Sequence, residues 1–478
     1  MSPLSENIDL VKEEIDRLFD LQLKNKQALK YTATTVRIVK LQKIKTWILK
    51  HRKDIQQAIY ADFKKPPIET DVSEVFVLTS EIKLISKKLR KWLKPQRVRP
   101  TLAMITTRSW IQYEPKGTVL IISPWNYPFM LAIEPLISAI AAGNSVVLKP
   151  SEISYNTSHL IKNMIEELFE KNEVKVFEGG KDTSSYLLSK PFDHIFFTGS
   201  TNVGKIVMKA AAENLTSVTL ELGGKSPVII DNTADLKDAA GKIAWSKFFN
   251  TGQSCQAPDY ILIHKSKKEE FISLLKNEIK KFCGNTDDEC LISKSYSEVI
   301  NKINVNRLSY LLDDAKNNGA KVELGGKVIK ENNFIFPTIL SGQLENSKIM
   351  KEEIFGPILP VVTFSKLQDA YSVIDSNGIP LAVYIFSNDK KNVDDILKNT
   401  SSGGSCINDL FIQFSHLNLP FGGVGNSGMG RAHGFYGFKT FSNERSILKH
   451  HKYSPLKLLF PPYTKTTQKL VDLIIKYF

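Results

Sequence analysis

Residues 117–148, GTVLIISPWNYPFMLAIEPLISAIAAGNSVVL, are almost uncharged, with Glu134 as the one charged side chain. Three prolines and the Gly143-Asn144 pair interrupt the stretch, so its pieces are too short to cross a membrane. They predict a buried strand at 119–123, a helix at about 129–141 and a second buried strand at 145–149. Because parallel strands buried on both faces look continuously apolar, this pattern indicates a βαβ unit.

Strands and helices keep alternating after this unit. The apolar runs VKVFEG, HIFFTG and VTLELG lie before Lys225, and YILIHK, ILPVVTF and LAVYIFS follow it. Two such blocks predict an α/β fold with two doubly wound parallel sheets and a boundary near 223–226. Residues 8–95 carry helical periodicity, whereas 101–116 are rich in β-formers and indicate an exposed hairpin or arm.

The chain of 478 residues is basic, with a net charge of +14 at pH 7. A positive balance favours anionic partners such as nucleotides or membrane surfaces. However, no Lys/Arg block is interleaved with stacking aromatic residues, and no zinc-finger or RNA-recognition signature is present. We therefore predict a lysine-rich surface and no nucleic-acid partner.

The cysteines indicate a reducing environment. Cys255, Cys283, Cys290 and Cys406 form no Cys-x-x-Cys pair and no zinc-binding spacing, which predicts free thiols and no metal site. The N-terminus has a mixed charge and lacks the layout of a secretion signal. Together these features predict a cytoplasmic location.

Two glycine motifs require interpretation. The first is a turn between a predicted strand and helix, made of Gly199, Ser200, Thr201, Asn202, Val203 and Gly204. Ile206 stands where a P-loop carries Ser or Thr for Mg²⁺, which weakens an ATPase interpretation and leaves a pyrophosphate site or a plain turn as alternatives. The second motif, GVGNSG at 423–428, lacks the strand and helix of a dinucleotide fingerprint and is interpreted as a glycine-rich loop.

Three residues have side chains suited to covalent catalysis. Cys255 lies on a loop that leads into a strand, where a thiol can act as a nucleophile, although a single cysteine is more often part of the packing. Glu221 ends an apolar strand, where burial would raise its pKa and make it a usable base; the alternative is a capping or ion-paired glutamate. Asn126 lies between two prolines and has an amide suited to stabilising an oxyanion, or to satisfying its own turn.

Two further polar residues are candidates for ligand contacts. Lys149 ends the second strand of the βαβ unit, where an ammonium group can reach ribose hydroxyls or phosphate. Glu353, in KEEIFGP, is a second candidate polar contact.

Taken together, these motifs resemble the aldehyde dehydrogenase superfamily. The resemblance runs from about residue 20 to about 450 and is densest in SPWNYP, VVLKPSE, FTGSTNVGK, TLELGGKSP, FFNTGQSC, EEIFGP and LPFGGVGNSGMG. The short N-terminus, APDY after Cys255 and the late Pro-Pro-Tyr are similar to the class 3 branch, which includes fatty aldehyde dehydrogenases. Ser254 precedes the cysteine where Thr is more usual, which removes no catalytic group. The substrate-side stretch 411–418 is less typical of the family, which leaves the substrate open.

The resemblance implies roles for these residues. Cys255 corresponds to the nucleophile, Glu221 to the general base and Asn126 to the oxyanion-hole amide. The cofactor contacts implied are Lys149, Glu152, Glu353, Phe355 and the turn from Gly199 to Gly204. Glu152 would meet the adenosine ribose and repel a 2′-phosphate, so NAD is expected as the cofactor, with NADP possible in this branch.

The implied reaction is the NAD(P)-dependent oxidation of an aldehyde, medium- or long-chain aliphatic or aromatic, to the acid through a cysteine thiohemiacetal and a thioester. An ionised thiol at Cys255 is expected to attack the carbonyl. One alternative is an acylating enzyme that passes the thioester to coenzyme A, for which the base Glu221 would be unnecessary. The other is a non-catalytic protein that retains the fold.

The resemblance also implies a domain organisation. Residues 1–100 and 117–222 are expected to form a Rossmann-like NAD-binding domain, and 223–410 the catalytic domain. Residues 101–116 and 411–448 would form a small β oligomerisation arm and an active-site loop, which predicts a homodimer.

The C-terminal tail, 449–478, is basic and ends in a predicted amphipathic helix. Lysines flank its apolar residues, so the helix could lie at an anionic membrane surface. The alternatives are that it covers the substrate entrance or packs on its own domain or a dimer mate.

Overall fold

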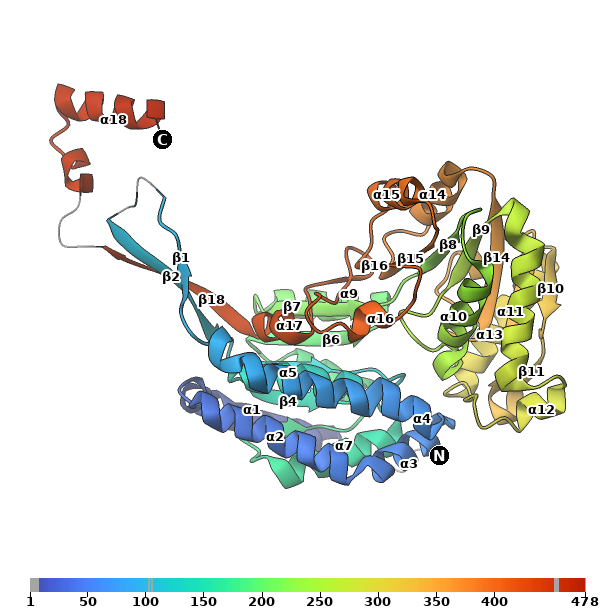
Figure 1. The fold of residues 1–478 in the computed structure, drawn as a ribbon. Helices are drawn as coiled ribbons and strands as arrows, with labels where there is room; N and C mark the ends of the chain where they lie inside the picture. The colour runs from blue at the N-terminus through green and yellow to red at the C-terminus, as the bar shows by residue number, and fades with distance from the viewer. Residues whose placement is uncertain (1–7, 102–103, 105, 451–454, 478) are drawn as a thin grey trace.

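The computed structural model describes residues 8–101, 104, 106–450 and 455–477. Two α/β lobes lie side by side, and a thin β arm extends from the first lobe (Figure 1). This arrangement confirms the predicted α/β fold with two doubly wound sheets.

The first lobe is built on a six-stranded sheet. Its strand order is β17 (Gly428–Met429), β7 (Ser217–Leu222), β6 (His194–Gly199), β3 (Thr118–Ile122), β4 (Ser145–Lys149) and β5 (Val174–Val176). All neighbours are parallel except β17, which pairs antiparallel with β7. The predicted βαβ unit is β3, α6 (Met130–Ala142) and β4.

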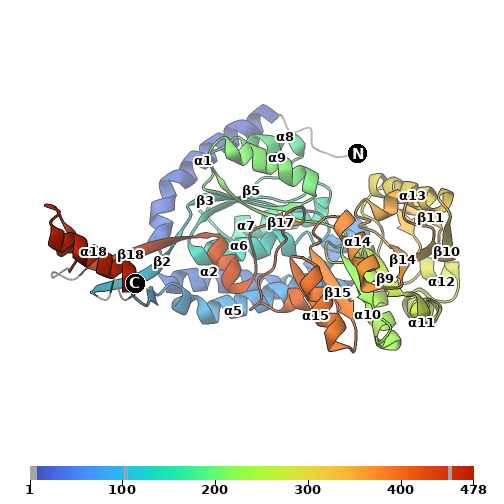
Figure 2. The same cartoon turned by 90° about the horizontal axis from the view of Figure 1, so that it is seen from above.

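Burial on both faces explains why β3 and β4 read as continuously apolar. Val119 and Ile121 point into one hydrophobic core, and Leu120 between them points into another. The first core is formed with α2 (Thr34–Lys50), α3 (Arg52–Phe63), α5 (Phe76–Trp92), α6 and α7 (Tyr155–Leu168). The second is formed with α1 (Ile8–Lys30), α8 (Lys181–Leu188) and α9 (Thr201–Ala212), and Figure 2 shows helices on both sides of the sheet.

The second lobe repeats this design. Its strand order is β10 (Ala320–Leu324), β13 (Thr338–Gly342), β14 (Ile358–Phe364), β9 (Tyr260–His264), β8 (Pro227–Ile230), β15 (Ala382–Phe386) and β16 (Gly404–Ile407). One face carries α10 (Leu236–Phe248) and α11 (Lys268–Cys283), and the other carries α13 (Lys302–Asn317), α14 (Leu367–Ser376) and α15 (Lys390–Asn399). The edge strand β10 runs antiparallel to β13, as β17 does to β7. Each sheet therefore has one antiparallel edge strand, whereas the prediction had parallel strands throughout.

The remaining elements are short. They are α4 (Pro67–Thr70) and the π-helical turn η1 (Asp71–Val75) before α5, α12 (Asp287–Leu291), the hairpin β11 (Val328–Ile329) and β12 (Phe334–Ile335), and the helices α16 (Ile412–Ser415) and α17 (Gly434–Thr440). Because η1 continues directly into α5, the two form one long helical segment inside the region 8–95, where the sequence shows helical periodicity. The chain passes from the first sheet to the second between Leu222 and Pro227. The full domain division stays a prediction.

The arm consists of β1 (Gln96–Val98), β2 (Thr107–Pro115) and β18 (Ser442–His450). β18 pairs with β2 along its whole length, so segments distant in sequence form one ribbon. The helix α18 (Lys465–Tyr477) lies near the end of this arm (Figure 1). None of the helices in the described ranges is long and apolar enough to span a lipid bilayer.

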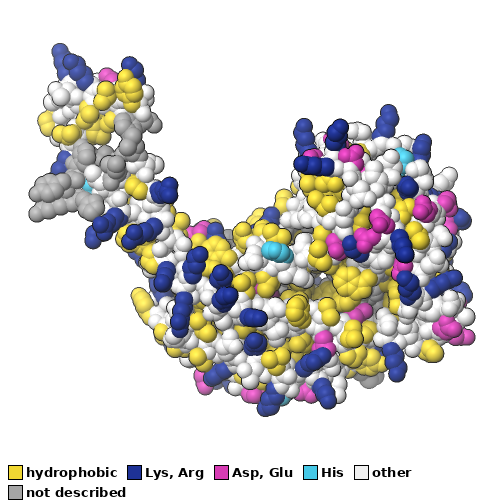
Figure 3. Space-filling model, viewed as in Figure 1, with side chains coloured by type: hydrophobic (Ala, Val, Ile, Leu, Met, Phe, Trp, Pro, Cys, Tyr) yellow, Lys and Arg dark blue, Asp and Glu magenta, His cyan; other side chains and the backbone are white. Residues whose placement is uncertain are grey.

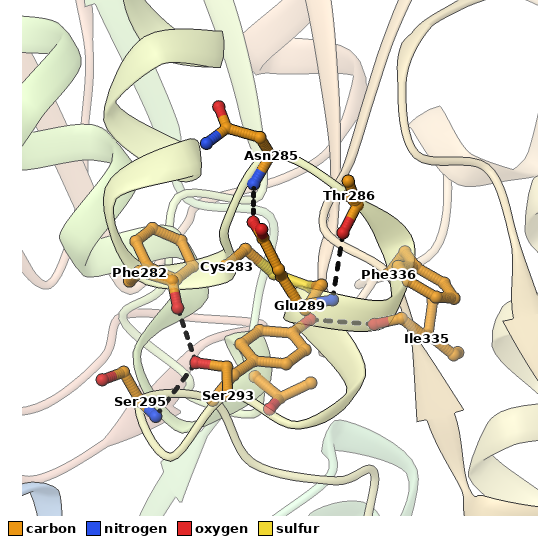
Figure 4. The surroundings of a disulfide bond; sticks show 12 residues. Phe282, Cys283, Asn285, Thr286, Glu289, Ser293, Ser295, Ile335 and Phe336 are labelled. Carbon is orange, nitrogen blue, oxygen red and sulfur yellow. Dashed lines mark hydrogen bonds between the residues drawn. A yellow bond between two sulfur atoms is a disulfide. The ribbon is translucent and has the colours of Figure 1, made fainter.

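The structure corrects the prediction of four free thiols. Cys283, at the end of α11, and Cys290, in α12, form a disulfide, whereas Cys255 and Cys406 are free (Figure 4). Gly284 ends α11 with a positive φ of 81°, and Glu289 accepts a hydrogen bond from the Asn285 N–H at 2.6 Å. This tight turn brings two cysteines seven residues apart together, which their sequence spacing alone did not indicate.

Candidate active site

A cavity of about 930 Å³ lies between the two lobes at the carboxyl ends of the first sheet's strands. Ligands of open α/β sheets bind at this edge. The predicted residues that line it are Asn126, Gly199, Ser200, Thr201, Asn202, Glu221, Cys255, Glu353 and Phe355. Lys149, Glu152, Val203 and Gly204 are not among the lining residues.

A sharp loop places Cys255 on the cavity wall. Asn250, Thr251 and Gly252 all have positive φ, at 54°, 55° and 72°. A Cβ at Gly252 would collide with the carbonyl group of Gly356, in the EEIFGP loop, so only glycine allows this close approach. The loop ends with the Cys255 side chain partly exposed to the cavity.

Buried polar contacts hold this loop against the first lobe. The Asn250 N–H donates to Glu69 Oε2 at 2.9 Å, and the Asn250 side chain donates to the backbone oxygen of Asn126 at 2.9 Å. The amide of Asn126 donates in turn to the Gln253 carbonyl at 3.1 Å. The thiol loop and the candidate oxyanion donor are therefore fixed to each other.

Glu221 lies near the end of β7, between β6 and β17. Neither of its carboxylate oxygens has a hydrogen-bond partner among the described residues. Burial raises its pKa well above the usual value, and the charge of Arg431 only partly opposes this effect. A carboxylate in this state can accept a proton readily.

The resting thiol differs from the ionised form expected from the sequence. Burial and the charges of Glu353 and Glu221 raise the pKa of Cys255, while backbone N–H groups at Cys255 and Gln256 act in the opposite direction. The structure thus favours a neutral thiol at rest. A nucleophilic role for Cys255 would require a thiolate, which a base or a bound cation would favour by changing the local charge.

Glu353 faces the Gly223-Gly224 pair, which leaves room for its carboxylate. Burial raises its pKa to about 7, with a further contribution from Asp259. Arg307 donates to the backbone oxygens of Glu353 at 3.1 Å and Ile354 at 2.6 Å. Phe355, with φ of 48°, packs edge-on against Trp125 at 5.4 Å. The EEIFGP loop is thus held rigidly beside the thiol.

The glycine turn opens α9 and faces the cavity. Ser200 caps the helix by accepting from the Val203 N–H at 3.4 Å, and Thr201 donates to the Asn426 carbonyl in the GVGNSG loop at 3.0 Å. Gly204 lets α9 approach β7, because a Cβ there would lie 2.7 Å from Leu222 Cδ2. The start of a helix that lines a cavity suits a pyrophosphate, so these residues fit a dinucleotide.

Lys149 and Glu152 form a pair outside this cavity. Lys149 Nζ lies 3.2 Å from Glu152 Oε2 and donates to the Pro150 carbonyl at 2.8 Å. Burial lowers the pKa of Lys149, although the charge of Glu152 acts in the opposite direction. The pair lies at the end of β4, beside the strand that leads to Asn126.

Sequence reasoning missed several lining residues. Trp245, Phe249 and Phe411 form an aromatic cluster with ring centroids 5.4–6.4 Å apart, and Arg307, Glu134 and His433 add polar groups. The atypical stretch 411–418 and the charge of Glu134 in an apolar helix were the available signals. Among the described residues, no group of His, Cys, Asp and Glu is arranged to hold a metal ion.

Comparison with known proteins identifies the family. The sequence model described as "Aldehyde dehydrogenase family" matches residues 4–447. The chain belongs to the aldehyde dehydrogenase family. It is 43% identical to "Putative aldehyde dehydrogenase AldX" of Bacillus subtilis (strain 168), over 91% of this chain and 98% of that protein. The prediction of an oxidoreductase acting on aldehydes is confirmed at this level.

Two further relatives narrow the branch. The chain is 43% identical to the "4,4'-diaponeurosporen-aldehyde dehydrogenase" of Staphylococcus aureus (strain NCTC 8325 / PS 47), over 88% of this chain and 91% of that protein. It is 40% identical to "Aldehyde dehydrogenase family 3 member H1" of Arabidopsis thaliana, over 92% of this chain and 90% of that protein. Relatives named as family 3 members confirm the predicted resemblance to class 3.

Solved aldehyde dehydrogenase structures share the fold. The structure "Substrate bound state of Staphylococcus Aureus AldH" matches with a TM-score of 0.92 at 40% identity, covering 96% of this chain and 99% of that one. PnpE in complex with nicotinamide adenine dinucleotide matches with a TM-score of 0.83 at 25% identity, covering 92% of this chain and 91% of that one. GapN from Methanocaldococcus jannaschii complexed with NADP matches with a TM-score of 0.82 at 26% identity, covering 92% of this chain and 95% of that one. Nicotinamide dinucleotides in these relatives agree with the predicted cofactor.

Proposed function

We propose that this protein oxidises an aldehyde to its carboxylic acid through a covalent thioester on Cys255. The observation that carries the proposal is one cavity lined by Cys255, Asn126 and Glu221 together. A thiol, an amide donor and a base are the three groups that covalent aldehyde oxidation needs.

The first half of the reaction uses the thiol and the amide. Cys255 loses its proton and its sulfur attacks the aldehyde carbon, which places negative charge on the carbonyl oxygen. Asn126 stabilises that oxygen through the second N–H of its side-chain amide while the first stays on the Gln253 carbonyl, and the backbone N–H of Cys255 is a further donor. The C–H bond of this adduct then breaks as the carbonyl group re-forms, which leaves a thioester on Cys255. A bound NAD(P)⁺ would accept the hydride and would supply positive charge near the thiol.

The second half uses Glu221. Its raised pKa lets it take a proton from a water molecule, whose oxygen attacks the thioester carbon. The C–S bond breaks, the carboxylic acid leaves, and the sulfur takes up the proton held by Glu221, which restores the thiol. The presence of this base argues against the acylating alternative, in which the thiol of coenzyme A attacks the thioester and no water has to be activated. Product analysis with and without coenzyme A tests that alternative.

The cofactor would lie along the first lobe. Gly199 to Gly204 would hold the pyrophosphate at the start of α9, and Glu353 with Phe355 would flank the ribose next to the nicotinamide. Lys149 and Glu152, paired after β4, would meet the adenosine ribose. A carboxylate at Glu152 disfavours a 2′-phosphate, so we expect tighter binding of NAD than of NADP.

The aromatic cluster supports a medium- or long-chain aliphatic or an aromatic aldehyde. Trp245, Phe249 and Phe411 line the cavity, and Trp245 is 48% exposed. Hydrophobic side chains also gather where the two lobes meet (Figure 3). Such walls favour apolar substrates because they remove hydrocarbon from water. A panel of aldehydes of increasing chain length tests this choice.

The arm supports a homodimer. Among the described residues, β18 is the longer of the two edge strands of the arm and pairs only with β2. A long exposed edge strand can pair with a second copy of the chain. Light scattering after size-exclusion chromatography should then give a mass near twice 53.9 kDa, and a monomer would contradict this assignment.

The tail supports a peripheral contact with an anionic membrane surface. No residue of α18 is buried, and Leu473, Ile475 and Tyr477 are more than half exposed beside Lys469 and Lys476. Lys and Arg side chains also crowd the arm and the neighbouring face of the first lobe (Figure 3). Such helices bind lipid headgroups through charge and apolar burial together. Full-length chain should pellet with anionic liposomes, and a chain ending before Pro461 should not; equal pelleting would refute the contact.

A cytoplasmic location is part of the proposal, because a nucleophilic thiol works only in its reduced form. The disulfide between Cys283 and Cys290 would be unusual there.

The decisive experiment is replacement of the nucleophile. Cys255→Ser should abolish NAD(P)H production from every aldehyde in the panel, while Cys406→Ser, which changes the other free thiol, should retain it. Full activity of Cys255→Ser would overturn the proposal.

A further inference from the structure

A second cavity, of about 630 Å³, lies beside the catalytic cavity, where the first lobe meets α10 and α11 of the second lobe. Its volume is within the range of about 300–1,000 Å³ that is typical of ligand pockets. Cys255, Asn126 and Glu221 line the first cavity and not the second. The second cavity therefore has no part in the reaction steps described above.

Three apolar side chains line both cavities, namely Val72, Trp245 and Phe249. The rings of Trp245, in α10, and Phe249, directly after α10, are 5.4 Å apart between centroids. Trp245 is half-exposed, so its ring offers free apolar surface to a ligand. The aromatic wall of the catalytic cavity thus continues into the second cavity.

One face of α10 forms a wall of the second cavity. Its members recur at the spacing of helical turns and are Gly241, Ala244, Trp245 and Phe248. Phe248 packs against Phe282 of α11, which also lines the cavity, with ring centroids 6.0 Å apart. This wall is apolar along its whole length.

The first lobe supplies another apolar wall. Ile68 in α4 and Val72 in η1 both line the second cavity, and they are four residues apart in one continuous helical segment. Ile68 is 75% exposed and Val72 is 51% exposed. Single exposed apolar residues are common, but these two belong to one cavity together with the apolar face of α10. Both lobes thus present hydrocarbon surface to the same open space.

The charged groups of the second cavity are exposed or already bonded. Lys281 and Lys294 are exposed, which places them where the cavity meets solvent, and Lys281 Nζ lies 2.6 Å from Glu278 Oε2. The buried carboxylate of Glu69 accepts the Asn250 N–H at 2.9 Å. The interior of the cavity therefore suits a hydrocarbon chain better than a polar ligand.

Gly241 keeps this cavity open. A Cβ at Gly241 would meet only the carboxylate of Glu278, at 3.9 Å, and the backbone there does not have the positive φ that requires glycine. Glycine inside a helix is also less stable than alanine. Neither the backbone nor close packing thus requires glycine at this position, and its missing side chain leaves space between α10 and α11.

We propose that the second cavity holds the hydrocarbon end of a long, unbranched aliphatic aldehyde, and that Gly241 sets the chain length that fits. This inference rests on the proposed function and selects long aliphatic substrates over aromatic ones. The aldehyde carbon lies at Cys255, the chain passes over Trp245 and Phe249, and its far end lies along α10. Each methylene group that leaves water favours binding about fourfold.

Gly241→Leu tests the inference, because a leucine side chain would fill the space along α10. The measurement is kcat/KM for dodecanal and for propanal, which is too short to leave the catalytic cavity. The ratio of the two values should fall about tenfold in Gly241→Leu. Gly241→Ala, which adds a single methyl group, should give a smaller fall.

A matched control and a second variant separate substrate binding from folding. Lys237→Leu introduces the same side chain at an exposed position of α10 outside both cavities, and it should keep the wild-type ratio. Ile68→Asp places a charge on the facing wall at an exposed position and should lower the ratio as Gly241→Leu does.

Binding of the product acid gives a readout that needs no turnover. The Kd of dodecanoic acid, measured by titration calorimetry without cofactor, should rise about tenfold in Gly241→Leu. Lys237→Leu should bind the acid as the wild type does. Since both variants keep the same C-terminal tail, any binding of the acid to α18 would be equal in the two.

A wild-type ratio in Gly241→Leu would overturn the inference, and so would an equal fall in Lys237→Leu. An equal loss of activity towards both aldehydes in Gly241→Leu and in Ile68→Asp would also overturn it. None of these results touches the proposed function, which fails instead if the wild-type protein forms no NAD(P)H from either aldehyde.

Discussion

The side-chain amide of Asn126 donates a hydrogen bond to the carbonyl oxygen of Gln253 at 3.1 Å. One of the two N–H groups of this amide is thus used two residues before the thiol that the amide is proposed to assist. The second N–H can donate to the oxyanion formed on the substrate, whose charge makes it a strong acceptor. The resting contact holds the donor in place until that charge develops.

Replacement of Asn126 should therefore lower the rate of acylation. We expect Asn126→Ala to reduce kcat about 10²- to 10³-fold, as for removal of one oxyanion donor, with a smaller change in KM. Stopped-flow measurement of the first turnover checks this. A normal first turnover in this variant would show that the amide has only the structural contact with Gln253.

The neutral resting state of Cys255 has a consequence for its reactivity. Because burial and two carboxylates raise its pKa, the thiol should react with iodoacetamide more slowly than a free cysteine at pH 7. Its reactivity should keep rising with pH beyond pH 9. Bound NAD⁺ should accelerate alkylation through its positive charge. A fast reaction at pH 6 without cofactor would show a thiolate at rest.

Glu69 should make the stability of the fold depend on pH. Burial raises its pKa from 4.5 to about 7, so the folded state binds its proton more tightly than the unfolded state does. The contribution of Glu69 to the free energy of unfolding should therefore be largest below pH 4.5. It should fall by about 3 kcal/mol in total as the pH rises through 7.

Glu69→Gln should flatten that dependence while it keeps an acceptor for the Asn250 N–H. Thermal unfolding of both proteins between pH 5 and pH 8 tests this expectation. A wild-type slope in the variant would assign the pH dependence to other carboxyl groups.

Gly252 should tolerate no side chain. Its φ of 72° and the carbonyl group of Gly356 leave no space for a Cβ, so Gly252→Ala should displace the loop that carries Cys255. We expect a loss of at least tenfold in activity and a lower melting temperature. Gly180→Ala is the control, because its Cβ would meet nothing within 4 Å.

Much of the fold could be predicted because both sheets are buried on both faces. The apolar strand at 145–149 was predicted with the bounds of β4. The chain crosses between the sheets at 222–227, while the domain boundary near 223–226 stays a prediction. The antiparallel edges β10 and β17 were missed, since strand direction depends on connections that a local pattern does not encode.

The candidate site was predictable where its residues lie in motifs. Cys255, Glu221 and Asn126 come together as expected, but their roles stay a proposal. Glu81, which does not line the cavity, is buried on α5 and accepts a hydrogen bond from the Gly434 N–H at 2.7 Å. Its burial was not predictable, because a charged residue in an amphipathic helix is expected on the solvent side and the contact comes from α17, far along the chain. The disulfide was missed for a similar reason, since only the turn at Gly284 brings Cys283 to Cys290.

The most direct test of the covalent mechanism is to trap the acyl group on the thiol. Glu221→Gln, incubated with an aldehyde and NAD⁺, should form NADH in a single burst and accumulate an adduct on the peptide that contains Cys255. Its mass should increase by that of the acyl group minus one hydrogen, as read by mass spectrometry. An unmodified Cys255 peptide after a full NADH burst, or an adduct on Cys406 instead, would contradict the account.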